Sequence, residues 1–368
     1  MGLADPGSLS PKHAVVTYIS ARLFADGMAK DVPRTNTNPA PILRVLAAAS
    51  RGRADAMGTD IARFPSDLAS PVWRRVTELT TDPGLLSSIE RRVAADVLLR
   101  LGYVKRASAL LGMDGVDAAT HRFTDTQVAI KEFAVLYWRS HDPLALEQLA
   151  LHGASDPSLD ADTRLSLATF VIVRNGKLRI ETAEMHQAIG LGESALAELP
   201  VNHCASSLAK QSYYRGLAFL PFLRHDEAGT FELLDRALQA QADAVPRGEL
   251  EGLAWTDYAF PLFETLAKTN LLTGRFDSAL AATDRLLELS PHDHRAWVAR
   301  GQALVELGEL EEALAAYTHM EALGGLPAAA ATFYQGWIHE QLGNPDLARA
   351  CFERSQSIDP TVEIGVKQ

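Results

Sequence analysis

The sequence contains little of what disulfide-stapled, zinc-binding or membrane-spanning proteins need. Its 368 residues include only two cysteines, Cys204 and Cys351, which lie too far apart for a C-x-x-C pair and are too few for a disulfide framework or a four-cysteine zinc site. The longest stretch without a charged residue, 322–339, is interrupted by glycine, proline and polar residues. A bilayer span needs about 20 predominantly apolar residues. No basic start followed by an apolar segment indicates a secretory signal. We therefore expect a soluble cytoplasmic protein that does not associate with membranes.

Positive charge is also in short supply. The chain has 35 Lys and Arg against 46 Asp and Glu, a net charge of −11. This excess of acid argues against broad binding to nucleic-acid phosphates. The balance is uneven, at +5 over residues 1–112 and −16 over residues 113–368. We interpret basic pairs such as Arg74-Arg75 and Arg91-Arg92 as a solvated helix face, with a patch for an acidic partner as the alternative.

Strand signals are scarce, and helical periodicity takes their place. No apolar–polar alternation persists along the chain, and Ala, Leu, Glu and Arg are abundant. Apolar residues recur at helical spacing, as in the stripe Leu304, Leu307, Leu310 and Leu314. Turn clusters rich in Pro, Gly, Asn and Asp follow at short intervals. The pattern predicts an all-α protein of short helices joined by short turns.

Short motifs that resemble catalytic or cofactor sites lack the partners that their chemistry needs. His292-Asp293-His294 has no further ligands at metal-binding spacing and stands where a helix N-cap is expected. His339-Glu340 begins like a zinc-binding H-E-x-x-H motif, but Gly343 replaces the second histidine. Gly190–Ala195 fits a dinucleotide fingerprint but follows a helical run instead of a strand. We therefore assign no catalytic residue, no cofactor and no metal.

The C-terminal third repeats itself. Gly274, Gly308 and Gly343 are spaced by 34 and 35 residues, and an alanine follows each of them five residues later. In the second and third units a further glycine, Gly301 or Gly336, stands seven residues before the turn glycine. We expect the turn glycine to end a helix in a left-handed conformation and the second glycine to allow two helices to cross closely.

The segment from Trp297 to Tyr317 is similar to the tetratricopeptide repeat (TPR) family. It carries a tryptophan, a glycine, a leucine, a turn glycine, an alanine and a tyrosine in the order and spacing of that family. The first unit departs from the pattern, because Ala267 stands where a glycine is usual and Thr283 where an aromatic is usual. The resemblance implies an all-α, TPR-like α-solenoid, a right-handed superhelix of antiparallel helix pairs.

The same reading divides the chain into four parts. Residues 1–65 are an N-terminal helical or arm region, and residues 66–259 are a divergent helical-repeat region. Three TPR units fill residues 260–360, and residues 361–368 form a C-terminal tail. Solenoid ends need a polar capping helix, and this tail is too short for one. We therefore expect Leu347, Cys351 and Ile358 to be exposed, and self-association through the C-terminal repeat is a further prediction.

In TPR arrays the first helix of each pair lines a concave groove, which implies a set of binding residues. The groove positions of this chain are Glu264, Lys268, Arg295, Gln302, Glu306, Phe333, Trp337 and Glu340. Aromatic and charged side chains together suit a peptide or a helix as ligand. Phe333 and Trp337 could instead pack inside the array. The sites with which TPR co-chaperones grip a terminal carboxylate hold a single basic residue here, Lys268, so we do not expect that clamp.

The favoured function is a protein–protein interaction adaptor, or scaffold, that binds a protein or peptide in the concave groove. Nothing in the sequence requires an enzyme. Two alternatives stay open. One is an enzyme with a pocket in the N-terminal helical region, using His121, His186 or His203 as acid–base groups. The other is a regulator that senses a small ligand or a peptide.

Overall fold

The structure is a computed structural model that describes most of residues 86–359. Residues 89, 90, 93, 94, 96–98, 100–103, 202, 248, 290–292 and 323–325 lie outside the described part. The expectations for residues 1–65 and for the tail 361–368 therefore fall outside it. Throughout the described ranges the regular secondary structure is helical and contains no β-strand. The prediction of an all-α solenoid of helix pairs is confirmed, while its right-handed sense stays a prediction.

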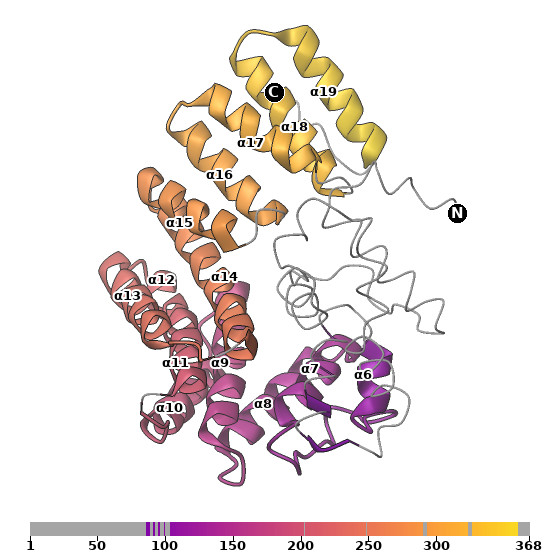
Figure 1. Cartoon of the computed structure of the whole chain (residues 1–368), viewed down its shortest axis with the longest axis vertical. Coiled ribbons are helices and arrows are strands. Elements are labelled where there is room, and N and C mark those ends of the chain that lie inside the picture. The colour runs from indigo at the N-terminus through magenta and orange to yellow at the C-terminus, as the bar shows by residue number, and fades with distance from the viewer. Residues whose placement is uncertain are drawn as a thin grey trace. The chain divides into compact units, whose positions relative to one another are not determined.

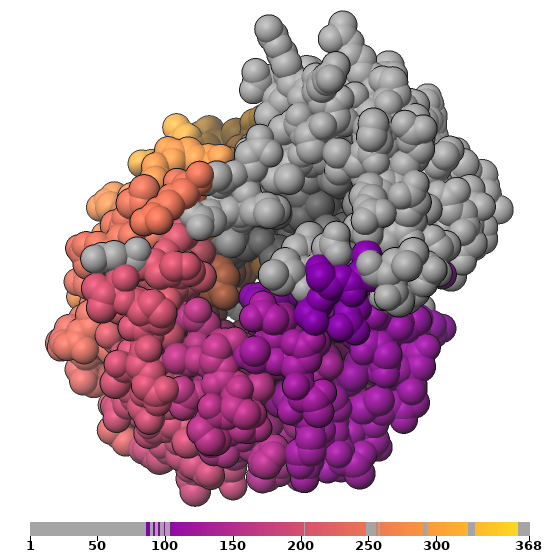
Figure 2. Space-filling model, turned by 60° about the horizontal axis from the view of Figure 1, so that its bottom comes forward, coloured from indigo at the N-terminus to yellow at the C-terminus, as the bar shows by residue number. Residues whose placement is uncertain are grey.

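Contacts between residues divide the chain into two compact units that meet at Leu262 and Phe263, inside one long helix. The space-filling view shows the described part of the first unit, indigo to pink, as a closely packed surface (Figure 2). Among the described residues, the helices of this unit are α6 (Val104–Leu110), α7 (Ala129–Arg139), α8 (Pro143–Ser155), α9 (Ala161–Leu178), α10 (Ala183–Ala197), α11 (Cys204–Leu217), α12 (Phe219–Leu223), α13 (Glu227–Asp243) and the first part of α14 (Glu249–Leu272).

The second unit is a regular stack of helices. It begins with the end of α14 and continues through α15 (Phe276–Leu289), α16 (His294–Glu306), α17 (Leu310–Ala322), α18 (Leu326–Gln341) and α19 (Pro345–Ile358). From α15 to α19, each helix packs against the next one in the chain (Figure 1). Its core cluster consists of Leu304, Ala313, Ala316, Tyr317, Met320, Ala331 and Ile338. A single helix pair cannot bury all of its apolar surface, so the neighbouring pairs cover the remainder.

The turn glycines of the second unit occupy equivalent bends. Gly274, Gly308 and Gly343 have φ of 72°, 79° and 72°, in the left-handed region that favours glycine. The N–H of Gly308 donates to the carbonyl of Val305 at 3.0 Å, and the next N–H donates to the carbonyl of Leu304 at 2.9 Å. The same pair of bonds recurs at the other two glycines. Each first helix therefore ends in a Schellman turn.

The first unit builds the same turn with glycine at Gly112, where φ is 68°, and twice more without glycine. Arg179 and His225 have φ of 57° and 59°, a region that residues other than glycine adopt rarely. At His225 the N–H donates to the carbonyl of Phe222 at 3.1 Å, and the following N–H donates to the carbonyl of Pro221 at 2.9 Å. Arg179 shows the same bonds after α9. The hairpin geometry of the C-terminal repeats thus extends upstream, to α9 with α10 and to α11 and α12 with α13.

Candidate binding groove

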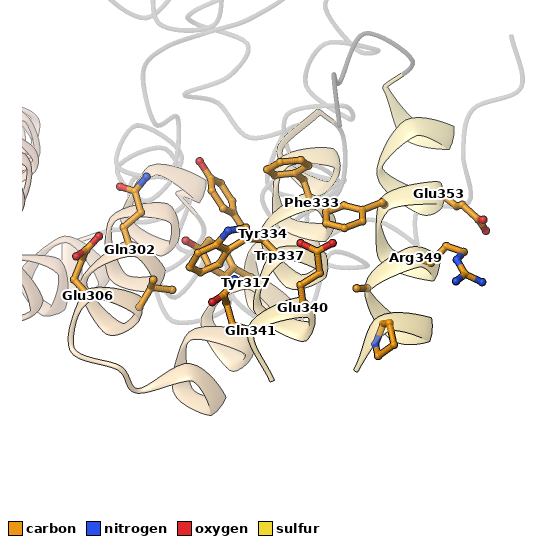
Figure 3. A pocket seen from close by; sticks show the side chains of 14 residues that line it. Gln302, Glu306, Tyr317, Phe333, Tyr334, Trp337, Glu340, Gln341, Arg349 and Glu353 are labelled. Carbon is orange, nitrogen blue, oxygen red and sulfur yellow. The ribbon is translucent and has the colours of Figure 1, made fainter. Parts of the chain in front are cut away.

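The last four helices enclose a pocket of about 920 Å³. This volume lies near the upper end of the range of roughly 300–1,000 Å³ that is usual for ligand sites. Its lining residues are Gln302, Val305 and Glu306 of α16; Tyr317 of α17; Phe333, Tyr334, Trp337, Glu340 and Gln341 of α18; and Pro345, Ala348, Arg349, Phe352 and Glu353 of α19. Figure 3 shows Trp337 and Glu340 in the middle, with Gln302 and Glu306 on the side of α16.

Helical spacing explains why these side chains share a face. Phe333, Trp337 and Glu340 follow one another at intervals of four and three residues, so they project from one side of α18. Gly336 borders this face, and a β-carbon there would lie 2.8 Å from Cε1 of Phe352. The opposite side of α18 carries Ile338, which is buried in the core cluster. The same close packing that buries one face of α18 turns the other toward the pocket.

The pocket wall is aromatic. The ring centroids of Phe333 and Phe352 lie 5.5 Å apart, and those of Tyr317 and Tyr334 stack at 4.9 Å. Burial raises the pKa of Tyr317, with a smaller contribution from Tyr334. Trp337 packs one edge against the core of the second unit and is only partly buried. Trp337 therefore both packs against the core and lines the pocket, while Phe333 lines the pocket beside Phe352.

The carboxylates of the pocket lack partners. Glu306, Glu340 and Glu353 are exposed, and their side chains form no hydrogen bond or ion pair with any described residue. The single cation of the lining, Arg349, lies 3.7 Å from Asp346 on its own helix. Both carboxylates and aromatic rings are thus available to a ligand.

The other three predicted groove residues form a separate ionic cluster between α14 and α16. Glu264 accepts a bond of 2.7 Å from Lys268 and lies 3.5 Å from Nη1 of Arg295. Arg295 also donates to both oxygens of Asp293, at 3.0 and 2.9 Å. Burial acts to lower the pKa of Arg295, but Asp293 and Glu264 outweigh it and raise that pKa overall. Glu264, Lys268 and Arg295 are therefore ion-paired, and none of them lines the pocket. The other five predicted groove residues do line it: Gln302, Glu306, Phe333, Trp337 and Glu340.

The histidines named for an enzymatic alternative lie apart in the first unit. His121 pairs with Glu132 through Nε2 at 3.1 Å, and His186 pairs with Glu181 at 2.7 Å. His203 is exposed and directly precedes α11. The three histidines therefore have different neighbours, and no described contact joins any two of them.

The short motifs that resemble cofactor or metal sites form parts of helices or helix caps. Gly190–Ala195 lies inside α10, with no strand before it. Asp293 caps α16 by accepting a bond of 3.0 Å from the N–H of Arg295. Among the residues that the structure describes, no group of three or more His, Cys, Asp or Glu side chains is placed to hold a metal ion. In the same part of the chain, no helix combines the length and apolar character that crossing a membrane requires.

Comparison with protein families gives the repeat its name. Two profiles, each described as tetratricopeptide repeat, match residues 265–324 and 329–362. The C-terminal helix pairs are tetratricopeptide repeats. The TPR boundaries agree with the hairpins of α14 with α15, α16 with α17, and α18 with α19. The pocket therefore lies within the last two TPR units and is lined in part by their first helices.

Other comparisons add little to the TPR assignment. A solved structure titled "MamA AMB-1 P212121" aligns over 55% of this chain and 96% of its own, with 19% identity and a TM-score of 0.36. A TM-score of this size does not establish a shared overall shape. A comparison with curated proteins returns no match.

Proposed function

We propose that this chain is an adaptor whose last two TPR units hold a segment of a partner protein in the pocket between α16 and α19. The single observation that supports this most is the pocket itself, about 920 Å³ in volume, in which aromatic rings and unpaired polar groups face the same space. TPR arrays act by binding proteins, so an open pocket on such an array is best accounted for by a protein ligand.

The aromatic wall supplies the affinity in this proposal. Partly buried Trp and Tyr side chains dominate the binding energy of many interfaces, because they bury a large area at a low cost in conformational entropy. Trp337 packs against the core cluster, so its side chain has few alternative rotamers and loses little conformational entropy when a partner binds. Its indole N–H meets no acceptor among the described residues and can donate to a backbone carbonyl of the partner.

The test compares two tryptophans. Partner proteins captured from native lysate are identified for the wild-type chain, for Trp337→Ala and for Trp138→Ala. Trp138 is 38% exposed on α7, outside the pocket. We expect the captured set to be lost with Trp337→Ala and kept with Trp138→Ala. Equal capture by all three proteins would refute the proposal.

The enzymatic alternative makes the opposite prediction. It requires His121→Ala, His186→Ala or His203→Ala to abolish function, whereas an adaptor should capture the same partners with all three variants. The separate surroundings of these histidines favour the adaptor.

We also propose self-association through the last helix. Leu347 and Ile358 are 53% and 37% exposed, and Cys351 between them is partly buried. The three recur at intervals of four and seven residues, which puts them on one face of α19. A second copy of the chain could cover this apolar face.

A further inference from the structure

We propose that the pocket selects cationic segments, in which lysine or arginine flanks an aromatic or aliphatic anchor. This inference rests on the proposed adaptor function and names the chemistry of the partner. It follows from how the charges of the second unit are distributed between the pocket and its surroundings.

Among the described residues, several carboxylates elsewhere in the second unit are ion-paired, although Asp277, Glu309, Glu311 and Glu312 are not, whereas all three glutamates of the pocket are unpaired. Glu264 pairs with Lys268 and Arg295, Glu321 pairs with Arg354, and Glu288 pairs with Arg285. The pocket carboxylates of Glu306, Glu340 and Glu353 face no cation of their own, and Arg349 is already shared with Asp346.

Three unpaired carboxylates around one space act together. Coulomb interactions between exposed charges extend over a Debye length, about 8 Å at physiological ionic strength. Figure 3 shows Glu340 in the middle of the pocket, with Glu306 and Glu353 toward its two ends. A lysine or arginine that enters the pocket is attracted by whichever of these carboxylates lies within that range, while a glutamate or aspartate is repelled. The acidic rim therefore both favours cationic partners and disfavours anionic ones.

The aromatic wall recognises the same side chains. An ammonium or guanidinium group over the face of a tryptophan or phenylalanine is attracted by the negative face of the ring. Phe333 and Trp337 lie on the same face of α18 as Glu340, which Figure 3 shows beside them. One pocket thus offers a ring face and a carboxylate to a single cation, and apolar area to the stem or to a neighbouring anchor residue.

The experiment is selection from a phage-displayed library of random linear peptides on the full chain. Enriched peptides are then synthesised, and their affinities are measured by fluorescence anisotropy at about 0.05 M and about 0.5 M salt. The test protein carries three substitutions in the pocket: Glu306→Gln, Glu340→Gln and Glu353→Gln. The matched control has the same change in net charge on exposed residues outside this pocket: Glu309→Gln, Glu311→Gln and Glu312→Gln.

We expect enriched peptides to combine Lys or Arg with an aromatic or aliphatic residue. The pocket variant should weaken their binding roughly tenfold at low salt and much less at high salt, because exposed ion pairs are screened. The control variant should bind like the wild type.

The remaining outcomes separate this inference from the proposed function. If acidic or uncharged peptides are enriched, and Trp337→Ala abolishes their binding, the cationic selectivity is wrong and the groove function stands. The same holds if both triple variants weaken binding equally. If no enriched peptide depends on Trp337, both proposals are wrong, and light scattering then shows whether a second copy of the chain fills the pocket.

Discussion

Gly301 and Tyr317 meet at the crossing of α16 and α17, where a β-carbon on Gly301 would lie 2.5 Å from Cζ of Tyr317. Tyr317 is 1% exposed and belongs to the core cluster, so moving its ring disturbs the packing around it. The corresponding positions of the preceding hairpin hold Ala267 and Thr283, both fully buried. A larger residue on the first helix is thus matched by a smaller one on the second, and the two positions act as a complementary pair.

We predict that Gly301→Ala destabilises the second unit. The added methyl group must displace the Tyr317 ring, and overpacking of this kind costs about 1–3 kcal/mol. Thermal or urea unfolding measures the loss, which should be smaller in a Tyr317→Thr background that imitates the preceding hairpin. Gly190→Ala is the control, because Gly190 is an exposed helical glycine with nothing within 4 Å of its β-carbon site. That change should stabilise by about 0.5–1 kcal/mol, and equal losses from both variants would contradict the crossing argument.

A second prediction concerns the left-handed turns. Gly308→Ala places a residue with a β-carbon at φ of 79°, which costs about 1–2 kcal/mol of stability. No atom lies within 4 Å of the new β-carbon, so no packing contact offsets this cost. His225→Gly should do the reverse, because glycine removes the strain at φ of 59°. The gain should be smaller than the loss at Gly308, since glycine also makes the unfolded chain more flexible. Unfolding midpoints of the two variants should therefore move in opposite directions, and movement in the same direction would argue against strain at His225.

The ion pair between the two non-glycine turns should make stability depend on pH. Glu181 accepts bonds from Arg224, at 3.1 and 2.5 Å, and lies 2.7 Å from His186. Hydrogen bonds from Arg224 and then His186 lower the pKa of Glu181 to about 2, from its ordinary 4.5. A lowered pKa means that the folded chain binds this proton more weakly than the unfolded chain does. The contribution is therefore complete above about pH 4.5 and disappears as the pH falls toward 2.

Thermal unfolding between about pH 6 and about pH 3 tests this relationship. Wild type should lose more stability over that interval than Glu181→Gln. The control is Glu232→Gln, which removes an exposed pair with Arg236 inside a single helix and connects no two turns. If Glu181→Gln and wild type show the same pH dependence, the link between the turns contributes nothing to stability.

Leu347→Glu should shift the chain toward the monomer. A charge on the exposed apolar face of α19 opposes burial of that face against a second copy. Light scattering at micromolar concentration measures the change. Leu178→Glu provides the control, since Leu178 is 54% exposed at the end of α9 and lies outside the second unit. A wild-type chain that is strictly monomeric, with a Leu347→Glu variant that behaves identically, would rule out this mode of self-association.

The candidate site was predictable where it depends on helical spacing. Phe333, Trp337 and Glu340 share a face because of their intervals, and Gln302 and Glu306 lie on the adjacent first helix. The contribution of α19 could not be read in the same way, because it is a second helix whose groove-facing residues depend on how the last pair packs. The pair of Glu264 and Lys268 has the i,i+4 spacing of a helical ion pair, whereas the contact of Arg295 with Glu264 emerged only in three dimensions.

The sequence by itself determined the repeat, because the features that encode it are local. Gly308 adopts the left-handed φ of the bend that follows α16. Gly301 allows α16 and α17 to cross closely, because it lacks the β-carbon that would collide with Tyr317. Tertiary structure decided the rest. Arg179 carries no sequence signal for a left-handed turn, and the ion pair of Glu181 with Arg224 connects its turn with that of His225. The pocket likewise exists only once four helices are stacked, because its wall is assembled from side chains as far apart in the sequence as Gln302 and Glu353.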